Sequence, residues 1–262
     1  MRIASWNINS VRNREQRVRD FLERSDVDVL CLQETKCTDD QFPDFSYTGY
    51  QHAHVGENAW NGVAILSRVG LEDVRSDFGQ PRFHKDPLAE PVLEPRAVGA
   101  RCGGVEVWSL YVPNGREISD RHFTYKIDFL DAMASYLEHG TEHGGGNGGD
   151  PVVVVGDFNV IPTDEDLWDR SWFEGKTHVT PRERAALDAL VRRGGVTEAT
   201  APLRGTYTYW DYQAMRFQRN QGIRIDLQYA RGLTPSAPRV DRDERSGKGA
   251  SDHAPVIVDY TL

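Results

Sequence analysis

The sequence has no long hydrophobic run and few cysteines, and each of these absences excludes a class of protein. No apolar stretch approaches the roughly 18 residues that a membrane-spanning helix requires, so we expect no membrane partner. The 3 cysteines, Cys31, Cys37 and Cys102, are odd in number and lack the spacing of zinc ligands. We therefore expect reduced thiols and a cytoplasmic protein. Residues 2–6 begin a strand-like pattern, which indicates no secretory signal.

The overall composition is that of a globular protein of ordinary size. Of 262 residues, 39% are hydrophobic and 27% are charged, which allows a substantial core. We expect one domain, residues 1–262, that works as a monomer. The net charge of −9 disfavours a nucleic-acid partner. Residues 204–248, however, hold nine Lys or Arg against five Asp or Glu, a local balance of +4.

Residues 152–159, Val-Val-Val-Val-Gly-Asp-Phe-Asn, form the most informative stretch. Four β-branched residues in a row predict a strand that is buried on both faces. The stretch ends in Asp157 and Asn159, which alternate about Phe158 and so can point the same way. Taken alone, a strand followed by a polar turn explains such a stretch equally well. Other apolar strands of this chain end in similar groups, which favours a site at the strand ends.

Three further predicted strands end in polar side chains: residues 2–9 at Asn7 and Asn9, residues 27–32 at Glu34, and residues 105–110 at Tyr111 and Asn114. Additional strands are expected at residues 62–67, near Val74 and at residues 256–260. Residues 38–60 and 78–95 are expected to be irregular, and the glycine-rich residues 144–149 to be a flexible connection.

Three helices are expected between these groups of strands. The first has its apolar positions at Val11, Val18, Phe21 and Leu22, and the second covers roughly residues 120–138. The third begins after an N-cap and capping box at residues 180–183 and ends at Gly194. Two mixed sheets packed face to face, with helices outside, would bury all these apolar faces. The pattern therefore predicts an α/β fold.

The side chains at the strand ends have the chemistry of a site for a hard cation. Carboxylates and amides suit magnesium, with manganese as the alternative, and do not suit zinc. Magnesium needs only one or two protein carboxylates besides water and substrate oxygens. Glu34 is the best candidate ligand, helped by Asn7 or Asp252.

The remaining polar groups could cleave a phosphodiester. Asp157 could accept a proton from the attacking water, with Asn159 holding that water. His253 could bind a phosphate oxygen as a cation, with Asp226 as the carboxylate that favours its charged form. Tyr111, Asn114 and Arg116 would donate to the phosphate or the leaving group. For His253 alone a structural role is the better interpretation, and the adjoining Asp252 reverses that preference.

Six motifs resemble, in order, those of the bacterial exonuclease III family, within the exonuclease–endonuclease–phosphatase superfamily. They are residues 6–9 (Trp-Asn-Ile-Asn), 32–36 (Leu-Gln-Glu-Thr-Lys), 111–115 (Tyr-Val-Pro-Asn-Gly), 156–159 (Gly-Asp-Phe-Asn), 224–226 (Arg-Ile-Asp) and 251–255 (Ser-Asp-His-Ala-Pro). The resemblance implies a four-layer α/β/β/α sandwich and a magnesium-dependent nuclease. It also implies 3′-to-5′ removal of nucleotides from double-stranded DNA and incision at abasic sites during base excision repair.

The resemblance also implies roles for single residues. The implied metal ligands are Asn7, Glu34 and Asp252, and the implied catalytic residues are Tyr111, Asp157, Asn159, Asp226 and His253. Relatives also place aspartate at the position of Asn9, which we therefore assign to substrate contact. The loop that probes the minor groove and lines the sugar pocket would use Tyr209, Trp210, Tyr212, Ile223 and Arg224, with Arg216 and Arg219 on phosphates. A core position is the alternative for the aromatic residues of this loop.

One segment departs from the pattern, and two other functions compete. Residues 174–179, Glu-Gly-Lys-Thr-His-Val, replace asparagines of some relatives, so the balance of exonuclease and abasic-site activity stays open. A phosphodiesterase or phosphatase of the same fold could act on another phosphoester, such as a phosphoinositide. A non-catalytic DNA-binding module is disfavoured because every apparent chemical position is filled.

Overall fold

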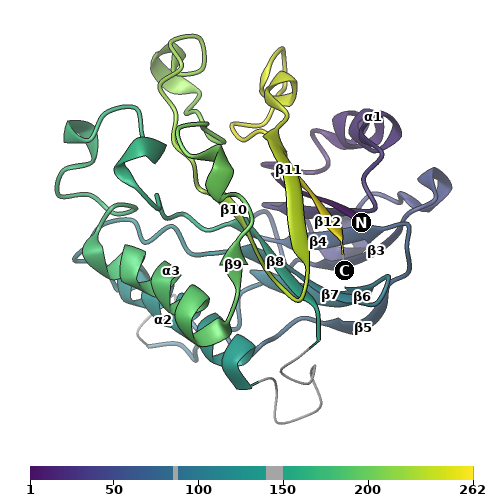
Figure 1. Cartoon of the computed structure of the whole chain (residues 1–262), viewed down its shortest axis with the longest axis horizontal. Coiled ribbons are helices and arrows are strands. Elements are labelled where there is room, and N and C mark those ends of the chain that lie inside the picture. The colour runs from purple at the N-terminus through teal and green to yellow at the C-terminus, as the bar shows by residue number, and fades with distance from the viewer. Residues whose placement is uncertain (85–87, 140–149, 262) are drawn as a thin grey trace.

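The computed structural model describes residues 1–84, 88–139 and 150–261, and its centre consists of two six-stranded sheets (Figure 1). The strand order is β11-β12-β1-β2-β4-β3 in one sheet and β5-β6-β7-β8-β10-β9 in the other. Both sheets are mixed, because β1 is parallel to β2 and β7 is parallel to β8 while the other neighbours are antiparallel. The expected connection at 144–149 lies outside the described residues.

The first sheet consists of β1 (Arg2–Asn7), β2 (Val29–Gln33), β3 (Gln51–Val55), β4 (Val63–Ser67), β11 (Thr234–Val240) and β12 (Val256–Thr261). The second consists of β5 (Glu72–Arg75), β6 (Ala97–Cys102), β7 (Val105–Tyr111), β8 (Val152–Asp157), β9 (Thr197–Glu198) and β10 (Asp226–Arg231). Within the described residues, the α-helices are α1 (Glu15–Ser25), α2 (Arg121–His139) and α3 (Pro181–Gly194). None of the helices in the described part of the chain is long and apolar enough to cross a membrane.

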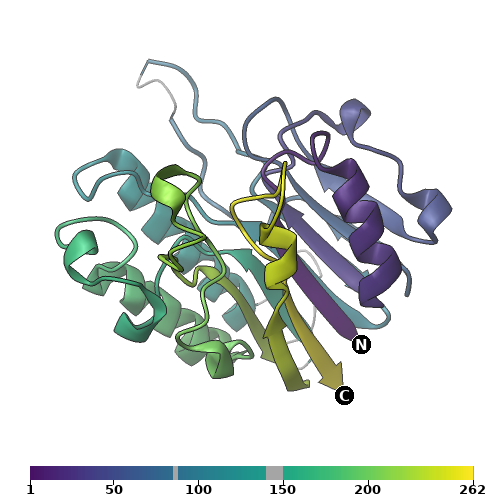
Figure 2. The ribbon, with the colours of Figure 1, turned by 90° about the horizontal axis from the view of Figure 1, so that it is seen from above.

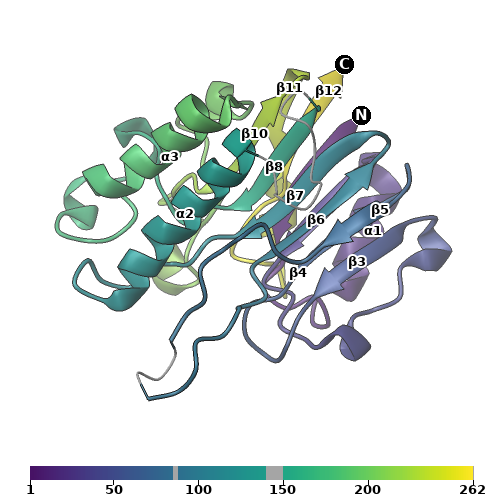
Figure 3. The ribbon, with the colours of Figure 1, turned by 90° about the horizontal axis from the view of Figure 1, so that it is seen from below.

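Three hydrophobic layers hold the sandwich together. Helix α1 covers one sheet, and α2 and α3 cover the other (Figures 2 and 3). Buried side chains of each helix layer form a hydrophobic cluster with the sheet that it covers. A third cluster fills the space between the sheets, with members from both, such as Val29 and Val153. The order of layers is therefore α/β/β/α, and the predicted sandwich is confirmed. The two ends of the chain lie side by side, since the amino group of Met1 donates to the carbonyl of Tyr260 over 2.7 Å.

Strand β8 shows why its valine run is required. Val152 and Val154 belong to the cluster beneath the helices, and Val153 and Val155 belong to the cluster between the sheets. The run ends at Gly156, where an added Cβ would lie 1.9 Å from the carbonyl oxygen of Leu110. Glycine is therefore needed for β7 and β8 to approach this closely just before the catalytic candidates.

Some elements differ from the sequence-based expectation. Helix α1 begins at Glu15, so Val11 lies in the turn before it. Strand β3 lies in the segment expected to be irregular, because an edge strand half exposed to solvent lacks a clear apolar alternation. Strands β6, β9, β10 and β11 were not among the expected strands. Gly99 interrupts the pattern of β6, and β11 is an exposed edge strand that contains two prolines.

Candidate active site

The predicted strand ends meet at one edge of the sandwich. Asn7 ends β1, and Glu34 directly follows β2. In the other sheet Tyr111 and Asp226 are both register partners of Asp157, from the neighbouring strands β7 and β10. The paired sheets therefore bring together groups that are far apart in the sequence.

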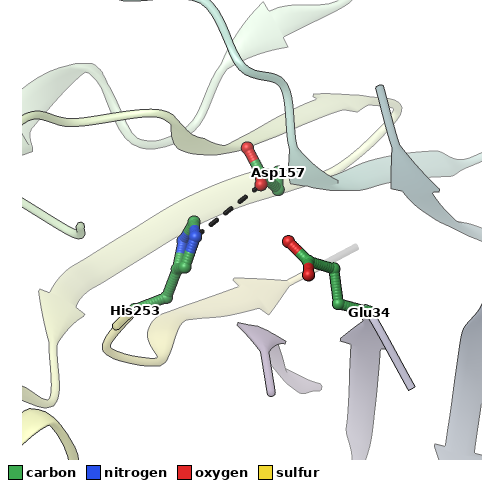
Figure 4. A group of neighbouring side chains, drawn as sticks. All are labelled: Glu34, Asp157 and His253. Carbon is green, nitrogen blue, oxygen red and sulfur yellow. Dashed lines mark ion pairs between the residues drawn. The ribbon is translucent and has the colours of Figure 1, made fainter. Parts of the chain in front are cut away.

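Three of these side chains face one another (Figure 4). One ligand atom each from Glu34, Asp157 and His253 lie within 4.8 Å of one another. The Nε2 of His253 is 3.8 Å from Oδ2 of Asp157. The amide of Asn7 joins the two carboxylates, since its Nδ2 donates to Glu34 Oε1 over 2.9 Å and to Asp157 Oδ2 over 3.0 Å.

His253 is held as a cation by surrounding carboxylates. Its Nδ1 lies 2.8 Å from Oδ2 of Asp226, which has no exposed surface. Burial alone would lower the pKa of His253, but the carboxylates of Asp226, Asp157 and Asp252 outweigh burial and raise this pKa to about 10. At neutral pH the imidazole is therefore protonated and suited to bind a negatively charged oxygen.

Asp157 has the properties of a group that exchanges protons near neutrality. Burial raises its pKa to about 7, with His253 acting against this increase and Asp226 and Glu34 adding to it. Its Oδ1 accepts a hydrogen bond of 2.9 Å from the backbone N–H of Asn159, which fixes the carboxylate orientation. A carboxylate with such a pKa can serve as a general base at physiological pH.

Asn159, Asn114 and Tyr111 border the same site. The Nδ2 of Asn159 donates to the carbonyl of Val112 over 3.0 Å, and its Oδ1 accepts from Asn114 Nδ2 over 3.0 Å. Burial and the neighbouring Glu34 carboxylate raise the pKa of Tyr111 well above its ordinary value. The Tyr111 phenol therefore stays protonated and can donate its hydrogen to a substrate.

The donor set fits a hard divalent cation, and Glu34 stays the predicted main ligand among the protein residues. The cluster offers carboxylate oxygens of Glu34 and Asp157, and no cysteine belongs to it. As oriented, Asn7 presents its N–H group to both carboxylates, while its Oδ1 accepts from the backbone N–H of Asn9 over 3.1 Å. Asp252 is held nearby through a 3.0 Å hydrogen bond from Nδ2 of Asn9. Asn7 thus orients Glu34, and Asp252 is available as a further oxygen donor.

A buried ion pair supports the site from below. The ammonium of Lys126, in α2, is fully buried and pairs with the carboxylate of Glu183, in α3. It also donates to the backbone carbonyls of Asn159, over 2.5 Å, and Asn114, over 3.2 Å. Glu183 in turn accepts from the backbone N–H of His178 over 2.8 Å. One charge pair thus fixes three segments that border the site.

An aromatic cavity of about 210 Å³ lies next to the cluster of Glu34, Asp157 and His253. The ring of Tyr209, one of its walls, lies 4.8 Å from the ring of His253. The guanidinium of Arg216 lies 4.5 Å from the rings of both Trp168 and Trp172. The remaining apolar and aromatic lining residues are Phe173, Ile223 and the imidazole of His178.

Two residues assigned to substrate contact in this loop are buried in the structure. Arg224 has no exposed surface, because its guanidinium pairs with Asp166 over 2.7 Å and with Glu198. Trp210 is 1% exposed and packs against Phe217 at 5.3 Å, so the alternative of a core position holds for it. Both side chains therefore pack within the loop and present almost no surface in this structure.

The other residues assigned to substrate contact remain accessible or close to the site. Arg116 is exposed and lines cavities of about 730 and 420 Å³ on either side of Asn114. Arg219 is exposed on the loop surface, and Tyr212 lies nearby, where its hydroxyl donates to the carbonyl of Ala250 over 2.9 Å. Their roles in binding stay predictions.

Sequence reasoning missed three features of this site. Lys36 was part of a motif but received no role, although it contacts Glu34. Trp168 and Trp172 form cavity walls, and their spacing in an irregular segment carried no signal. His178 lies in residues 174–179, the segment that departs from the relatives. Only the structure shows that its imidazole borders the cavity and that its φ is 82°.

Comparisons with known proteins agree with this architecture. Exodeoxyribonuclease III of Haemophilus influenzae is 28% identical over 277 residues, an alignment that covers 99% of this chain and 100% of the relative. The structure of a 3′-5′ exonuclease, NExo, from Neisseria meningitidis matches with a TM-score of 0.86 and 32% identity, over 100% of both chains. An AP endonuclease from Archaeoglobus fulgidus matches with a TM-score of 0.87 and 28% identity, also over 100% of both chains. Residues 4–253 match the model of the endonuclease/exonuclease/phosphatase family, so the chain belongs to that family, as its motifs predicted.

Proposed function

We propose that this chain is a magnesium-dependent DNA phosphodiesterase of base excision repair, with 3′-to-5′ exonuclease activity on double-stranded DNA and endonuclease activity at abasic sites. Its family and its named relatives make it a nuclease of the DNA-repair type. The observation that carries the proposal is the cluster of Glu34, Asp157 and His253 within 4.8 Å. Such a cluster provides a cation site, a base and a charged donor at one point.

The residues divide the chemistry among them. Glu34 would hold the divalent ion, with Asn7 orienting its carboxylate and Asp252 as a further donor. When bound, magnesium supplies charge relief to the phosphate. Asp157 accepts the proton of the attacking water. Protonated His253 binds a non-bridging phosphate oxygen, because Asp226 keeps it charged.

Other groups position the phosphate and its neighbours. Tyr111 and Asn114 donate to the phosphate or to the leaving oxygen, and Asn159 holds the water. The aromatic cavity beside His253 accepts the sugar, because a sugar without its base can leave the helix without breaking stacking. The amide of Asn9 donates to Asp252, and Asn9 would contact the DNA strand that is cleaved.

The proposed partner is double-stranded DNA with abasic sites or 3′ ends, bound by a monomer in the cytoplasm. A relative from Neisseria was solved with a product DNA hairpin, which supports DNA as the partner. Exposed Arg219 and the stacked Arg216 provide positive charge on the loop beside the cavity. The three cysteines are free, in keeping with a reducing compartment.

A substrate panel tests the proposal. It would contain recessed, blunt and abasic duplexes, a 3′-phosphate duplex and a phosphoinositide, each with magnesium, manganese or a chelator. We expect metal-dependent cleavage of the DNA substrates and none of the phosphoinositide. Binding of DNA without cleavage in any metal would instead identify a DNA-binding module.

A further inference from the structure

The ammonium group of Lys36 lies between a carboxylate oxygen of Glu34 and the amide oxygen of Asn9. Its Nζ is 2.7 Å from Oε2 of Glu34 and 2.6 Å from Oδ1 of Asn9. Glu34 uses its other oxygen, Oε1, to accept from Nδ2 of Asn7 over 2.9 Å. The ammonium therefore takes up the oxygen of Glu34 that Asn7 leaves open.

The backbone holds Lys36 in this place. Glu34 and Lys36 have φ values of 53° and 52°, in the left-handed region that residues other than glycine rarely adopt. Between them, the backbone of Thr35 donates to Gly62 O over 3.1 Å, and its hydroxyl lies 2.8 Å from His54 Nε2. A strained turn that its neighbours anchor on both sides is a sign of a functional requirement.

An ammonium and a divalent cation at Glu34 compete for the same carboxylate. Both the ammonium and the divalent cation would bind the lone pairs of the Glu34 oxygens. Two positive charges next to one carboxylate also repel each other. The side chain of Lys36 is 27% exposed, so its flexible stem can move toward the solvent side of the site.

We propose that Lys36 is a displaceable counter-cation of Glu34 that couples the binding of DNA to the binding of the divalent ion. Without DNA, Lys36 neutralises Glu34 and weakens its hold on magnesium. The phosphate of a bound strand attracts the ammonium and frees the carboxylate for the ion. Because such coupling is reciprocal, magnesium strengthens DNA binding by the same factor. This inference rests on the proposed function.

Magnesium titrations of Lys36→Gln by isothermal calorimetry test this coupling. Without DNA, we expect the variant to bind magnesium about tenfold more tightly than the wild type, within the usual range of such couplings. A duplex with phosphorothioate 3′ linkages should raise the magnesium affinity of the wild type more than that of the variant. Lys36→Arg keeps the charge and should behave as the wild type.

The matched control is Lys248→Gln, which removes the same charge at an exposed position outside the residues assigned to the site. It should leave the magnesium affinity unchanged, and thermal melts would confirm that all variants are folded. Equal or weaker magnesium binding by DNA-free Lys36→Gln would overturn the inference. Cleavage assays on the same wild-type sample separate the two hypotheses: absence of DNA cleavage would reject the proposed function, whereas cleavage with unchanged titrations would reject only the role of Lys36.

Discussion

At the scale of single residues, the electrostatic role of Asp226 is the sharpest feature of the site. Among the described residues, this fully buried carboxylate makes its side-chain hydrogen bond with the rear nitrogen of His253, and its charge also contributes to the raised pKa of Asp157. Burial by itself lowers the pKa of His253. The neighbouring carboxylates raise it to about 10, and Asp226 makes the largest contribution among them. Removing the charge of Asp226 should therefore change the pH dependence of catalysis.

In Asp226→Asn, the pKa of His253 should fall because the opposing effect of burial remains. The protonated form, which binds the phosphate, would then be lost at a lower pH. We expect the alkaline limb of the kcat/KM profile to move toward neutral pH, measured on a 3′-recessed duplex at fixed magnesium. Asp188→Asn, at an exposed position of α3, is the control and should keep the wild-type profile. An alkaline limb that stays in place would rule out His253 as the phosphate-binding cation.

His178 should control which substrates enter the aromatic cavity. Its imidazole lines this cavity, and its φ of 82° is one that glycine adopts without strain. His178→Gly would enlarge the cavity, and we expect abasic incision to rise about tenfold relative to 3′-end removal, the order typical of a change in pocket size. The measurement is the ratio of kcat/KM on a tetrahydrofuran duplex and on a recessed duplex. His84→Gly, in an exposed loop, should leave that ratio unchanged, and an unchanged ratio in His178→Gly would show that the imidazole does not limit entry.

At the scale of elements, α2 and α3 do more than cover a sheet, since their buried ion pair fixes the loops of the site. Lys126→Met would leave Glu183 charged and unpaired in the interior. We expect a loss of about 3–5 kcal/mol in the free energy of unfolding, measured with urea. Adding Glu183→Gln, which removes the unpaired charge and keeps the capping box, should recover part of that loss. A loss below about 1 kcal/mol, the value of an exposed pair, would contradict the structural role.

The elements that could be predicted are those whose pattern is dictated by burial. The valine run of β8 and the capping box of Thr180 and Glu183 each have one local explanation, and the structure contains both. Strand β11 could not be predicted, because it is an exposed edge whose pairing with β12 depends on distant residues. Helix α1 was placed too early, since the apolar Val11 is buried from a turn as well as from a helix.

At the scale of the whole molecule, the site exists only because two sheets pack face to face. Polar groups at strand ends were visible in the sequence, and their chemistry suggested a cation site before any geometry was known. The burial of Trp210 and Arg224 could not be predicted from the sequence, because an aromatic residue or an arginine in a loop can either contact a substrate or pack within the loop. Burial decides between these outcomes, and burial depends on the complete fold. That residues 1–262 act as one domain and a monomer stays a prediction.

The central claim is that Asp157 acts as the base of a metal-assisted phosphodiesterase centre with Glu34 and His253. Its most direct test is the single-turnover cleavage rate of Asp157→Ala on an abasic duplex at saturating magnesium, with DNA affinity measured in parallel. We predict a loss of about 3 kcal/mol or more of transition-state stabilisation, at least a hundredfold in rate, with DNA affinity retained. A variant that cleaves at the wild-type rate would contradict the account.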